Sequence, residues 1–322
     1  MNKILIIQTA SIGDVILATV LLENLHREFP SAKIDFLLKD GNQSLFEGHP
    51  FLNQVLIWDK SKNKYKNLFR LLLQIRKMRY DLLINVQRFL STGILTALSK
   101  AKATTGFTKN PCSFLFTRAV THCIDKHTHE IDRNLSLISN WIQNPKRIVK
   151  LYPTENDAEF VAKYKQNQYI TISPASLWFT KQLPVEKWIE LIETLPNSLT
   201  VYLLGSKKDK NRCEEIAKSL TDRNLHILAG ELTLLQSASL MQDAGMNYVN
   251  DSAPMHLCSA VNAATTAIFC STVPQFGFGP LSSNSHTIEC REDLPCRPCG
   301  LHGHAACPQK HFKCGYGVEV EL

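Results

Sequence analysis

The chain has 322 residues, of which 44% are hydrophobic, so it contains enough apolar material for the cores of two domains and has no disordered or low-complexity character. Its net charge of +7 comes from the first half, where residues 1–150 hold 22 Lys and Arg against 11 Asp and Glu. No apolar run reaches the length of about 20 residues that spans a bilayer, and no signal-peptide layout precedes the first strand pattern, so we expect a cytoplasmic protein.

Strand and helix patterns alternate along both halves of the chain. In the first half, short apolar runs predict strands over 3–8, 33–39, 54–59 and 81–87, with helices over 13–28, 64–78 and 91–99. A helix from 129 to about 143 is followed by a polar linker. In the second half the pattern predicts strands over 169–174, 199–204, 225–228, 246–250 and 265–270, with helices over 184–195, 209–220, 232–243 and 254–261. This alternation predicts two α/β domains with parallel sheets, residues 1–150 and 151–322.

The densest basic stretch runs from Lys60 to Arg79 and holds eight cations and no acid. Such a stretch is either a solvated helix face or a surface for an anionic partner. An anionic lipid surface suits the second alternative, because each nearby cation gains about 1 kcal/mol there. Nucleic acid is not expected, because no nucleic-acid-binding motif accompanies the charge.

Two loops place a carboxylate where a strand passes into a helix. Ser11-Ile12-Gly13-Asp14 follows the first strand, and Asn250-Asp251-Ser252-Ala253 follows the strand at 246–250. Ligands of open α/β sheets bind at such strand ends. Asp14 is either a capping carboxylate or a general base. Ser252 is either an ordinary helix cap or part of a phosphate site at a helix N-terminus.

Two further loops also lie between a strand and a helix. Lys181, in the loop that follows residue 173, could neutralise a diphosphate, and Asp209, after the strand at 199–204, could accept hydrogen bonds from a ribose. The chain contains neither Gly-x-Gly-x-x-Gly nor a Walker A sequence, which counts against a dehydrogenase and a P-loop kinase.

The C-terminal tail, about 290–316, is rich in cysteine and histidine. Its thiols Cys296, Cys299, Cys307 and Cys314 include one Cys-x-x-Cys pair, which is half of a common zinc site, but the second pair lacks that spacing. The tail is therefore either a structural zinc site or a reduced loop.

These loops, in this order, resemble the bacterial heptosyltransferases, the ADP-heptose-dependent enzymes of lipopolysaccharide core assembly. The resemblance covers nearly the whole chain and includes Thr104-Thr105-Gly106-Phe107, the segment from His129 to Leu135, and Thr272-x-Pro274. It implies the GT-B architecture, in which two Rossmann-like domains with parallel sheets face a central cleft. It also implies inverting sugar transfer without a catalytic metal or cofactor, with the donor nucleotide on the C-terminal domain.

The resemblance also implies a role for each matched residue. Asp14 corresponds to the general base. The charge of the first half, and not the resemblance, places the acceptor side there, with Ser11, Gly13, Lys62, Lys64 and Lys66. On the donor side, Ser176 and Lys181 correspond to phosphate contacts, Asp209 to the adenosine ribose contact and Asp251 to the contact with the transferred sugar, while the diphosphate lies at Ser252, Ala253, Met255 and His256. The chain departs from the family at Ala253-Pro254, where glycine is usual, and at Lys181-Gln182-Leu183-Pro184, where Lys-x-Trp-Pro is frequent.

The sequence therefore predicts an inverting glycosyltransferase that moves heptose from ADP-heptose to a glycolipid of the lipopolysaccharide or lipid A-core type. Its partners would be a nucleotide-diphosphate sugar and an anionic glycolipid, met at the inner face of the inner membrane by a peripheral cytoplasmic enzyme. One alternative is a transferase with another nucleotide-sugar donor, since the departures surround the donor. The other is a non-catalytic sugar-nucleotide-binding protein, since a fold does not fix a function.

Overall fold

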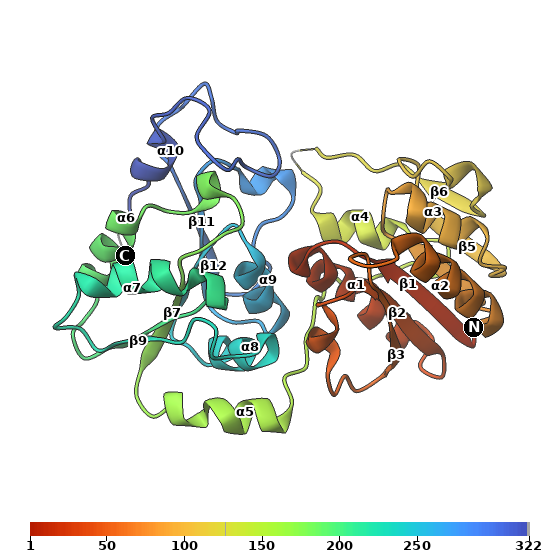
Figure 1. Cartoon of the computed structure of the whole chain (residues 1–322), viewed down its shortest axis with the longest axis horizontal. Helices are drawn as coiled ribbons and strands as arrows, with labels where there is room; N and C mark the ends of the chain where they lie inside the picture. Colours follow the sequence, from red (N-terminus) through yellow and green to blue (C-terminus); the bar gives the residue numbers. More distant parts are fainter. Residues whose placement is uncertain (126, 321–322) are drawn as a thin grey trace. The chain divides into compact units, whose positions relative to one another are not determined.

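The computed structural model describes residues 1–125 and 127–320, which divide into two compact units. Unit 1 comprises residues 1–124 and 128–152, and unit 2 runs from Pro153 to the end of the described chain and includes Asp125 and His127. Figure 1 shows a helix-covered sheet in each unit. The sequence placed the boundary near residue 150, and residues 321–322 of the predicted second domain lie outside the described residues.

Unit 1 is built on a six-stranded parallel sheet with the order β3-β2-β1-β4-β5-β6. Its central strand is apolar on both faces, with Ile4 to Ile7 fully buried, because helices cover both sides. This strand order is that of a Rossmann fold. The strands are β1 (Lys3–Gln8), β2 (Lys33–Lys39), β3 (Leu52–Trp58), β4 (Leu82–Asn85), β5 (Ala103–Phe107) and β6 (Arg118–Val120).

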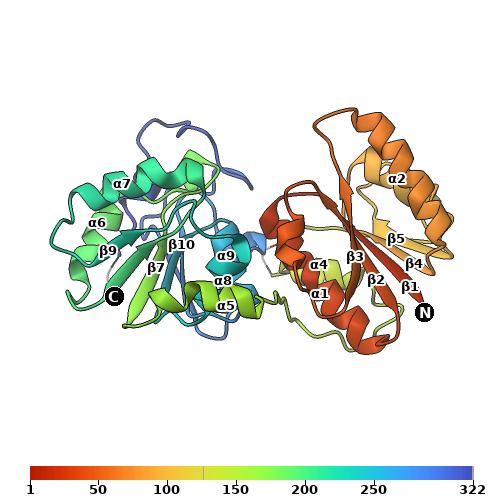
Figure 2. The same ribbon diagram turned by 60° about the horizontal axis from the view of Figure 1, so that its bottom comes forward.

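The helices of unit 1 form a layer on each side of its sheet (Figure 2). Helices α1 (Ile12–Glu28) and α4 (Glu130–Ser136) pack against each other on one side. Helix α2 (Lys64–Met78) covers the other side, with α3 (Leu90–Ala97) next to it. Two short 3-10 helices, η1 (Gln43–Phe46) and η2 (Ser113–Leu115), lie in the connections.

Unit 2 repeats the same topology, with the order β12-β11-β10-β7-β8-β9 and all neighbours parallel. Helices α6 and α7 pack together, and α8 packs with both α5 and α9. The strands are β7 (Tyr169–Ser173), β8 (Thr200–Leu203), β9 (Leu225–Ile227), β10 (Asn247–Asn250), β11 (Thr265–Phe269) and β12 (Ser285–Glu289). The helices are α5 (Glu155–Val161), α6 (Val185–Thr194), α7 (Lys210–Lys218), α8 (Leu234–Gln242), α9 (Ala253–Ala260) and α10 (Lys313–Tyr316), with the 3-10 helices η3 (Ala162–Tyr164), η4 (Phe179–Lys181), η5 (Lys207–Asp209) and η6 (Pro274–Phe276).

The prediction of two α/β domains with parallel sheets is confirmed, while the central cleft concerns the arrangement of the units and stays a prediction. Strands β5, β6 and β12 were not predicted, because short strands at or near a sheet edge carry little periodicity. Helix α5 lies in the segment predicted as a linker, where the capping box of Thr154 and Asp157 was the missed signal. The helix predicted over 129–143 ends at Ser136.

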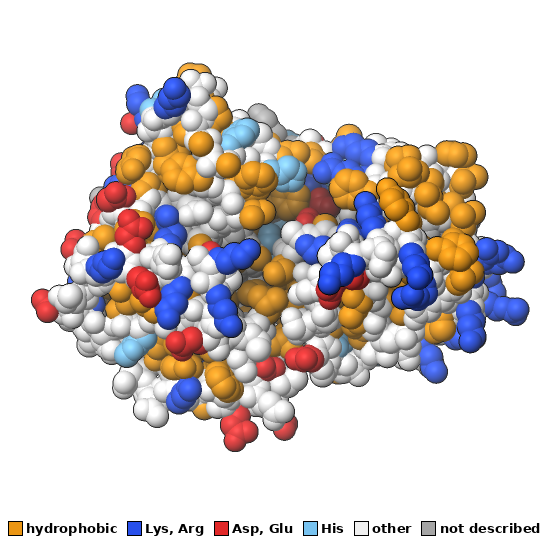
Figure 3. Space-filling view, viewed as in Figure 1, with side chains coloured by type: hydrophobic (Ala, Val, Ile, Leu, Met, Phe, Trp, Pro, Cys, Tyr) orange, Lys and Arg blue, Asp and Glu red, His pale blue; other side chains and the backbone are white. Residues whose placement is uncertain are grey.

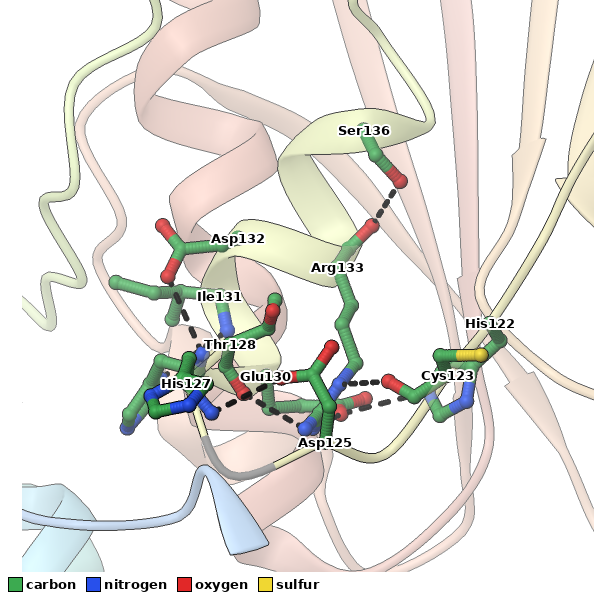
Figure 4. A network of polar contacts seen from close by, with 11 residues as sticks. His122, Cys123, Asp125, His127, Thr128, Glu130, Ile131, Asp132, Arg133 and Ser136 are labelled. Atoms are coloured by element: carbon green, nitrogen blue, oxygen red, sulfur yellow. Dashed lines mark hydrogen bonds and ion pairs between the residues drawn. The ribbon is translucent and has the colours of Figure 1, made fainter. Parts of the chain in front are cut away.

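A buried ionic network ties α4 to the segment that follows β6 (Figure 4). Glu130 Oε2 accepts a hydrogen bond from Arg133 Nη1 at 2.8 Å and lies 3.5 Å from His122 Nε2. Arg133 also donates to the carbonyl oxygens of Cys123 and Thr128, each at 2.7 Å. Desolvation alone would raise the pKa of Glu130, but the hydrogen bonds and charges of His122 and Arg133 outweigh it and lower that pKa.

Replacing Glu130 by Gln should lower the free energy of unfolding by about 2 kcal/mol at neutral pH, because the buried guanidinium of Arg133 then donates to a neutral amide oxygen instead of a carboxylate. The ionised carboxylate stabilises the fold above the pKa it has in the unfolded chain, and this contribution is lost as the pH falls through the lowered folded-state pKa. Urea unfolding over a pH series should therefore show the two proteins converging in acid. Glu47→Gln, at an exposed carboxylate, is the matched control, and equal losses in both variants would contradict the role of the network.

Candidate active site

The strand order of unit 2 reverses between β7 and β10. Ligands of open α/β sheets bind beside such a switch point, at the carboxyl ends of the strands. The loop after β7 carries Lys181, and the loop after β10 carries Asp251. These two loops define the candidate site of unit 2.

Lys181 and Asp251 form a buried ion pair across the switch point. Lys181 Nζ lies 2.6 Å from Asp251 Oδ2, and the two side chains are 14% and 8% exposed. The hydroxyl of Thr272 donates to the same carboxylate oxygen at 2.6 Å. The structure thus brings together the two residues predicted to contact the phosphates and the sugar, and it adds Thr272 to them.

The backbone of the Lys181 loop is clamped from two elements. Leu183 N–H donates to Oδ1 of the buried Asn250 at 3.0 Å. From α7, Arg212 donates its Nε to the carbonyl oxygen of Pro174 at 2.9 Å and an Nη2 hydrogen to that of Leu183. Because both ends of the loop are held, Lys181 is positioned before any ligand binds.

Helix α9 begins directly after Asp251, with Ser252 at its N-cap and Pro254 in its first turn. The Ser252 hydroxyl lies 3.5 Å from the carbonyl oxygen of Ala175 in the β7 loop. The side chains of Met255 and His256 are buried. The start of α9 therefore brings the positive end of a helix dipole next to the ion pair, and this end favours negative charge.

The other two predicted donor residues lie in loops of the same edge. Ser176 is half-buried in the loop that carries Lys181. Asp209 follows β8, the neighbour of β7, and its Oδ2 accepts hydrogen bonds from the amide and the hydroxyl of Ser206, each at 2.7 Å. This capping box orients the Asp209 carboxylate at the beginning of α7.

The C-terminal tail packs on the Lys181 loop. Thr180 N–H donates to the carbonyl oxygen of His304 at 3.1 Å, and His304 N–H donates to Thr180 Oγ1 at 2.8 Å. Gly303 has a φ of +74°, and a Cβ atom at this position would lie 2.9 Å from Lys181 Cγ. Glycine is required there for the backbone conformation and for close contact with the lysine side chain.

The tail cysteines belong to the packing of unit 2. Cys314 lies in the hydrophobic core, and Cys296 and Cys307 pack against it. Burial, with smaller effects of Cys299 and Cys307, raises the pKa of the Cys314 thiol to about 12. Among the described residues, no group of three or more His, Cys, Asp or Glu side chains is arranged to hold a metal ion. The structure therefore gives no support to the zinc-site alternative.

In unit 1 the strand order reverses between β1 and β4. The loop after β1 leads to Ser11, the N-cap of α1, and Asp14 lies in the first turn of that helix. The amide of Ser11 donates to Asp14 Oδ2 at 3.2 Å, and its hydroxyl donates to the same oxygen. Gly13 is buried in the first turn of α1. The capping geometry expected for Asp14 is present, and it fixes the carboxylate at the carboxyl end of the central strand.

A lysine that the sequence did not single out reaches the same loop. Lys60, after β3, donates its ammonium to the carbonyl oxygen of Thr9 at 2.9 Å and to its hydroxyl at 3.1 Å. Burial, with the nearby charges of Lys39 and Lys64, lowers the pKa of Lys60. The three lysines predicted for the acceptor side lie exposed before α2 and in its first turn: Lys62, Lys64 and Lys66.

Arg297 is the second residue that sequence patterns did not suggest. Its guanidinium donates to the carbonyl oxygens of Cys270 at 2.7 Å and Thr272 at 2.8 Å, and to Glu289 at 2.6 Å. It therefore braces the segment that carries Thr272 toward Asp251. Neither Arg297 nor Lys60 has a local sequence signal, because their partners are far away in the chain, whereas Thr272 lies in the Thr-x-Pro segment already noted.

Two Rossmann-type units, one of which holds a buried lysine–aspartate pair beside a helix N-terminus, are typical of two-domain α/β enzymes that bind phosphorylated ligands. The model of a protein family described as glycosyltransferase family 9 (heptosyltransferase) matches residues 68–306. The chain belongs to this family, and it is a glycosyltransferase.

Known proteins resemble the chain over most of its length. Lipopolysaccharide heptosyltransferase 3 of Escherichia coli is 25% identical over 292 residues, which cover 84% of each chain. The structure of E. coli ADP-heptose lps heptosyltransferase II superposes with a TM-score of 0.77 at 21% identity and covers 97% of this chain and 96% of its own. E. coli heptosyltransferase WaaC with ADP gives a TM-score of 0.72 at 19% identity, covering 88% and 92%. At these identities the two structures show the fold.

Replacing Arg297 by Lys should lower the free energy of unfolding by about 2–3 kcal/mol, because one ammonium cannot replace the planar fork that serves the buried carbonyl groups and Glu289. Arg291→Lys is the matched control, since Arg291 pairs with Glu319 at the surface and such a pair contributes only about 0–1 kcal/mol. Chemical denaturation of both variants tests the difference. Equal small losses would show that Arg297 does not brace the Thr272 segment.

Proposed function

We propose that the protein transfers heptose, with inversion, from ADP-heptose to an anionic glycolipid of the lipopolysaccharide core type. The observation that carries this proposal is the buried Lys181–Asp251 pair beside the start of α9, in a member of the heptosyltransferase family. The names of the similar E. coli proteins support the donor and the pathway, since one is an ADP-heptose enzyme and one was solved with ADP.

In this proposal unit 2 binds the donor. Lys181 and the amide groups at the start of α9 face the diphosphate, and Ser176 adds a phosphate contact. Asp251 accepts hydrogen bonds from the sugar hydroxyls, and Asp209 accepts them from the adenosine ribose. A diphosphate beside Lys181 would share its ammonium with Asp251, so donor binding replaces part of an existing ion pair instead of neutralising an isolated buried lysine.

Asp14 is proposed as the general base on the acceptor side. It takes the proton of the attacking acceptor hydroxyl while a new bond forms between that oxygen and the anomeric carbon of the sugar. The bond from the anomeric carbon to the diphosphate breaks on the opposite face, so ADP leaves and the configuration inverts. Lys181 and the helix dipole stabilise the negative charge that develops on the departing diphosphate.

The acceptor is assigned to unit 1 because of its charge. Lys60 contacts Thr9 in the loop that leads to Asp14. Lys62 follows it, and Lys64 and Lys66 lie in the first turn of α2. These ammonium groups suit the phosphates and carboxylates of an anionic glycolipid. An enzyme that uses such an acceptor would work at the cytoplasmic face of the inner membrane, as a peripheral protein.

A second candidate donor is another nucleotide sugar. The loop before Lys181 exposes Leu177, Trp178 and Phe179, and Pro254 removes one amide donor from the start of α9. Titration calorimetry with ADP, GDP and UDP separates these donors. If UDP or GDP bound most tightly, the protein would still be a transferase, but the proposed ADP-heptose donor would be wrong.

Asp14→Asn should reduce transfer by about 10²–10⁴-fold and leave ADP affinity unchanged, because it removes the base and touches no proposed nucleotide contact. Its matched control is Asp157→Asn, which alters an equivalent capping box at the start of α5. Single-turnover transfer assays with both variants make the comparison. Near-normal turnover in Asp14→Asn would leave the carboxylate as a helix cap only.

Lys181→Ala should weaken ADP binding by about 1.5–3 kcal/mol and adenosine binding far less, since the lysine is assigned to the diphosphate. Lys187→Ala, at a lysine paired with Glu190 on α6, should leave both affinities unchanged. Calorimetry with the two ligands measures the effect. A similar loss for ADP and adenosine would remove Lys181 from the phosphate site.

A further inference from the structure

The face of unit 1 that carries α2 exposes large apolar side chains. Tyr65, Phe69 and Leu73 are 79%, 62% and 50% exposed. They recur every fourth residue, so they lie above one another as a single stripe along the helix. A different stripe packs α2 onto the sheet: Leu68, Leu71, Leu72 and Ile75.

A row of cations borders the exposed stripe. Successive helical residues are rotated by about 100°, so the exposed stripe covers about 80° of the helix circumference. Lys66, Arg70 and Lys77 occupy the adjoining part of the helix circumference, which extends about 60° beyond the edge of the stripe. Helix α2 thus combines an exposed apolar stripe with a parallel basic row, and its stretch contains no acid.

The apolar surface continues on the neighbouring elements. Helix α3 packs beside α2, and η2 beside α3. Both expose pairs of large apolar residues, which are Phe89 and Leu90 at the start of α3 and Phe114 and Leu115 in η2. Figure 3 shows hydrophobic side chains gathered over this part of unit 1, with Lys and Arg side chains around them. A contiguous patch of this kind marks an interaction surface, whereas isolated exposed apolar residues do not.

We propose that this surface, the α2 face, docks on an anionic lipid bilayer. The apolar stripe enters the interfacial layer, and Lys66, Arg70 and Lys77 lie over the lipid phosphates, as in helices that rest in the plane of a membrane. Among the described helices, none has the length and hydrophobicity needed to cross a bilayer. The inference deepens the proposed function, because a lipid-linked acceptor is reached from the membrane surface.

The charge pattern favours a bilayer over a second copy of the chain. In a twofold pair of antiparallel α2 helices the two basic rows would face one another, and like charges oppose association. In a parallel pair each basic row would find no acidic side chain on the α2 stretch of the other copy. An anionic bilayer instead supplies both an apolar layer for the stripe and phosphates for the cations. The aromatic residues in the stripe suit the boundary between the two.

The test is flotation of the full-length protein with vesicles of phosphatidylcholine containing about one third phosphatidylglycerol, and with pure phosphatidylcholine vesicles, over a salt series. The apolar variant carries Tyr65→Ser, Phe69→Ser and Leu73→Ser, and it should lower binding to anionic vesicles by at least about tenfold. The matched control variant carries Ile148→Ser and Phe160→Ser at exposed apolar positions outside the α2 face, and it should bind like the wild type.

The basic variant carries Lys66→Gln, Arg70→Gln and Lys77→Gln, and it should lose up to about a hundredfold in binding to anionic vesicles and lose most of the salt dependence. Equal binding of the wild type and both variants would overturn the proposal. So would a wild-type dimer that the apolar variant makes monomeric without any vesicle binding, which would identify an interface between copies. Vesicle binding without sugar transfer would refute the proposed function alone, and transfer to a delipidated acceptor without vesicle binding would refute the docking alone.

Discussion

The ion pair between Lys181 and Asp251 is the interaction on which the organisation of unit 2 depends. A buried charge without a partner costs several kcal/mol, so the two loops after β7 and β10 must keep a fixed spacing. The polar side chains around them serve that spacing. Asn250 and Arg212 hold the backbone of the loop after β7. Arg297 holds the segment that carries Thr272, whose hydroxyl donates a hydrogen bond to Asp251.

This constraint also explains the cysteine-rich tail. A segment with thiols, histidines and glycines at these intervals suggests a metal ligand set, yet its backbone hydrogen-bonds to Thr180, and Gly303 packs on the stem of Lys181. Cys314 lies in the hydrophobic core of unit 2, and Cys296 and Cys307 pack against that core. The tail thus braces the candidate donor site, and Gly303 is required there because a larger residue would collide with Lys181 and Thr180.

The two units share one topology and differ in charge and in the residues at their switch points. Unit 2 carries a compensated pair and a helix N-terminus, which suit a ligand with a diphosphate. Unit 1 carries a carboxylate fixed by a helix cap and a half-buried lysine that follows β3 and reaches the loop after β1. Capping and catalysis are compatible uses of such a carboxylate, because the cap orients the group that would receive the proton. The excess of cations in the first half is consistent with the proposed binding of an anionic acceptor to unit 1.

The sequence by itself determined the two parallel-sheet domains and the loops at which Asp14, Lys181 and Asp251 lie, because strand and helix periodicity and strand–helix junctions are local properties. It also contained the capping signals of Asp14 and Asp209, which need only neighbouring residues. The tertiary structure decided the Lys181–Asp251 contact, the reach of Lys60 to Thr9, the clamp of Arg297 and the packing of the tail thiols. Each of these joins residues from separate strands or loops, and the sheet order that brings them together is set by long-range packing that no local pattern encodes.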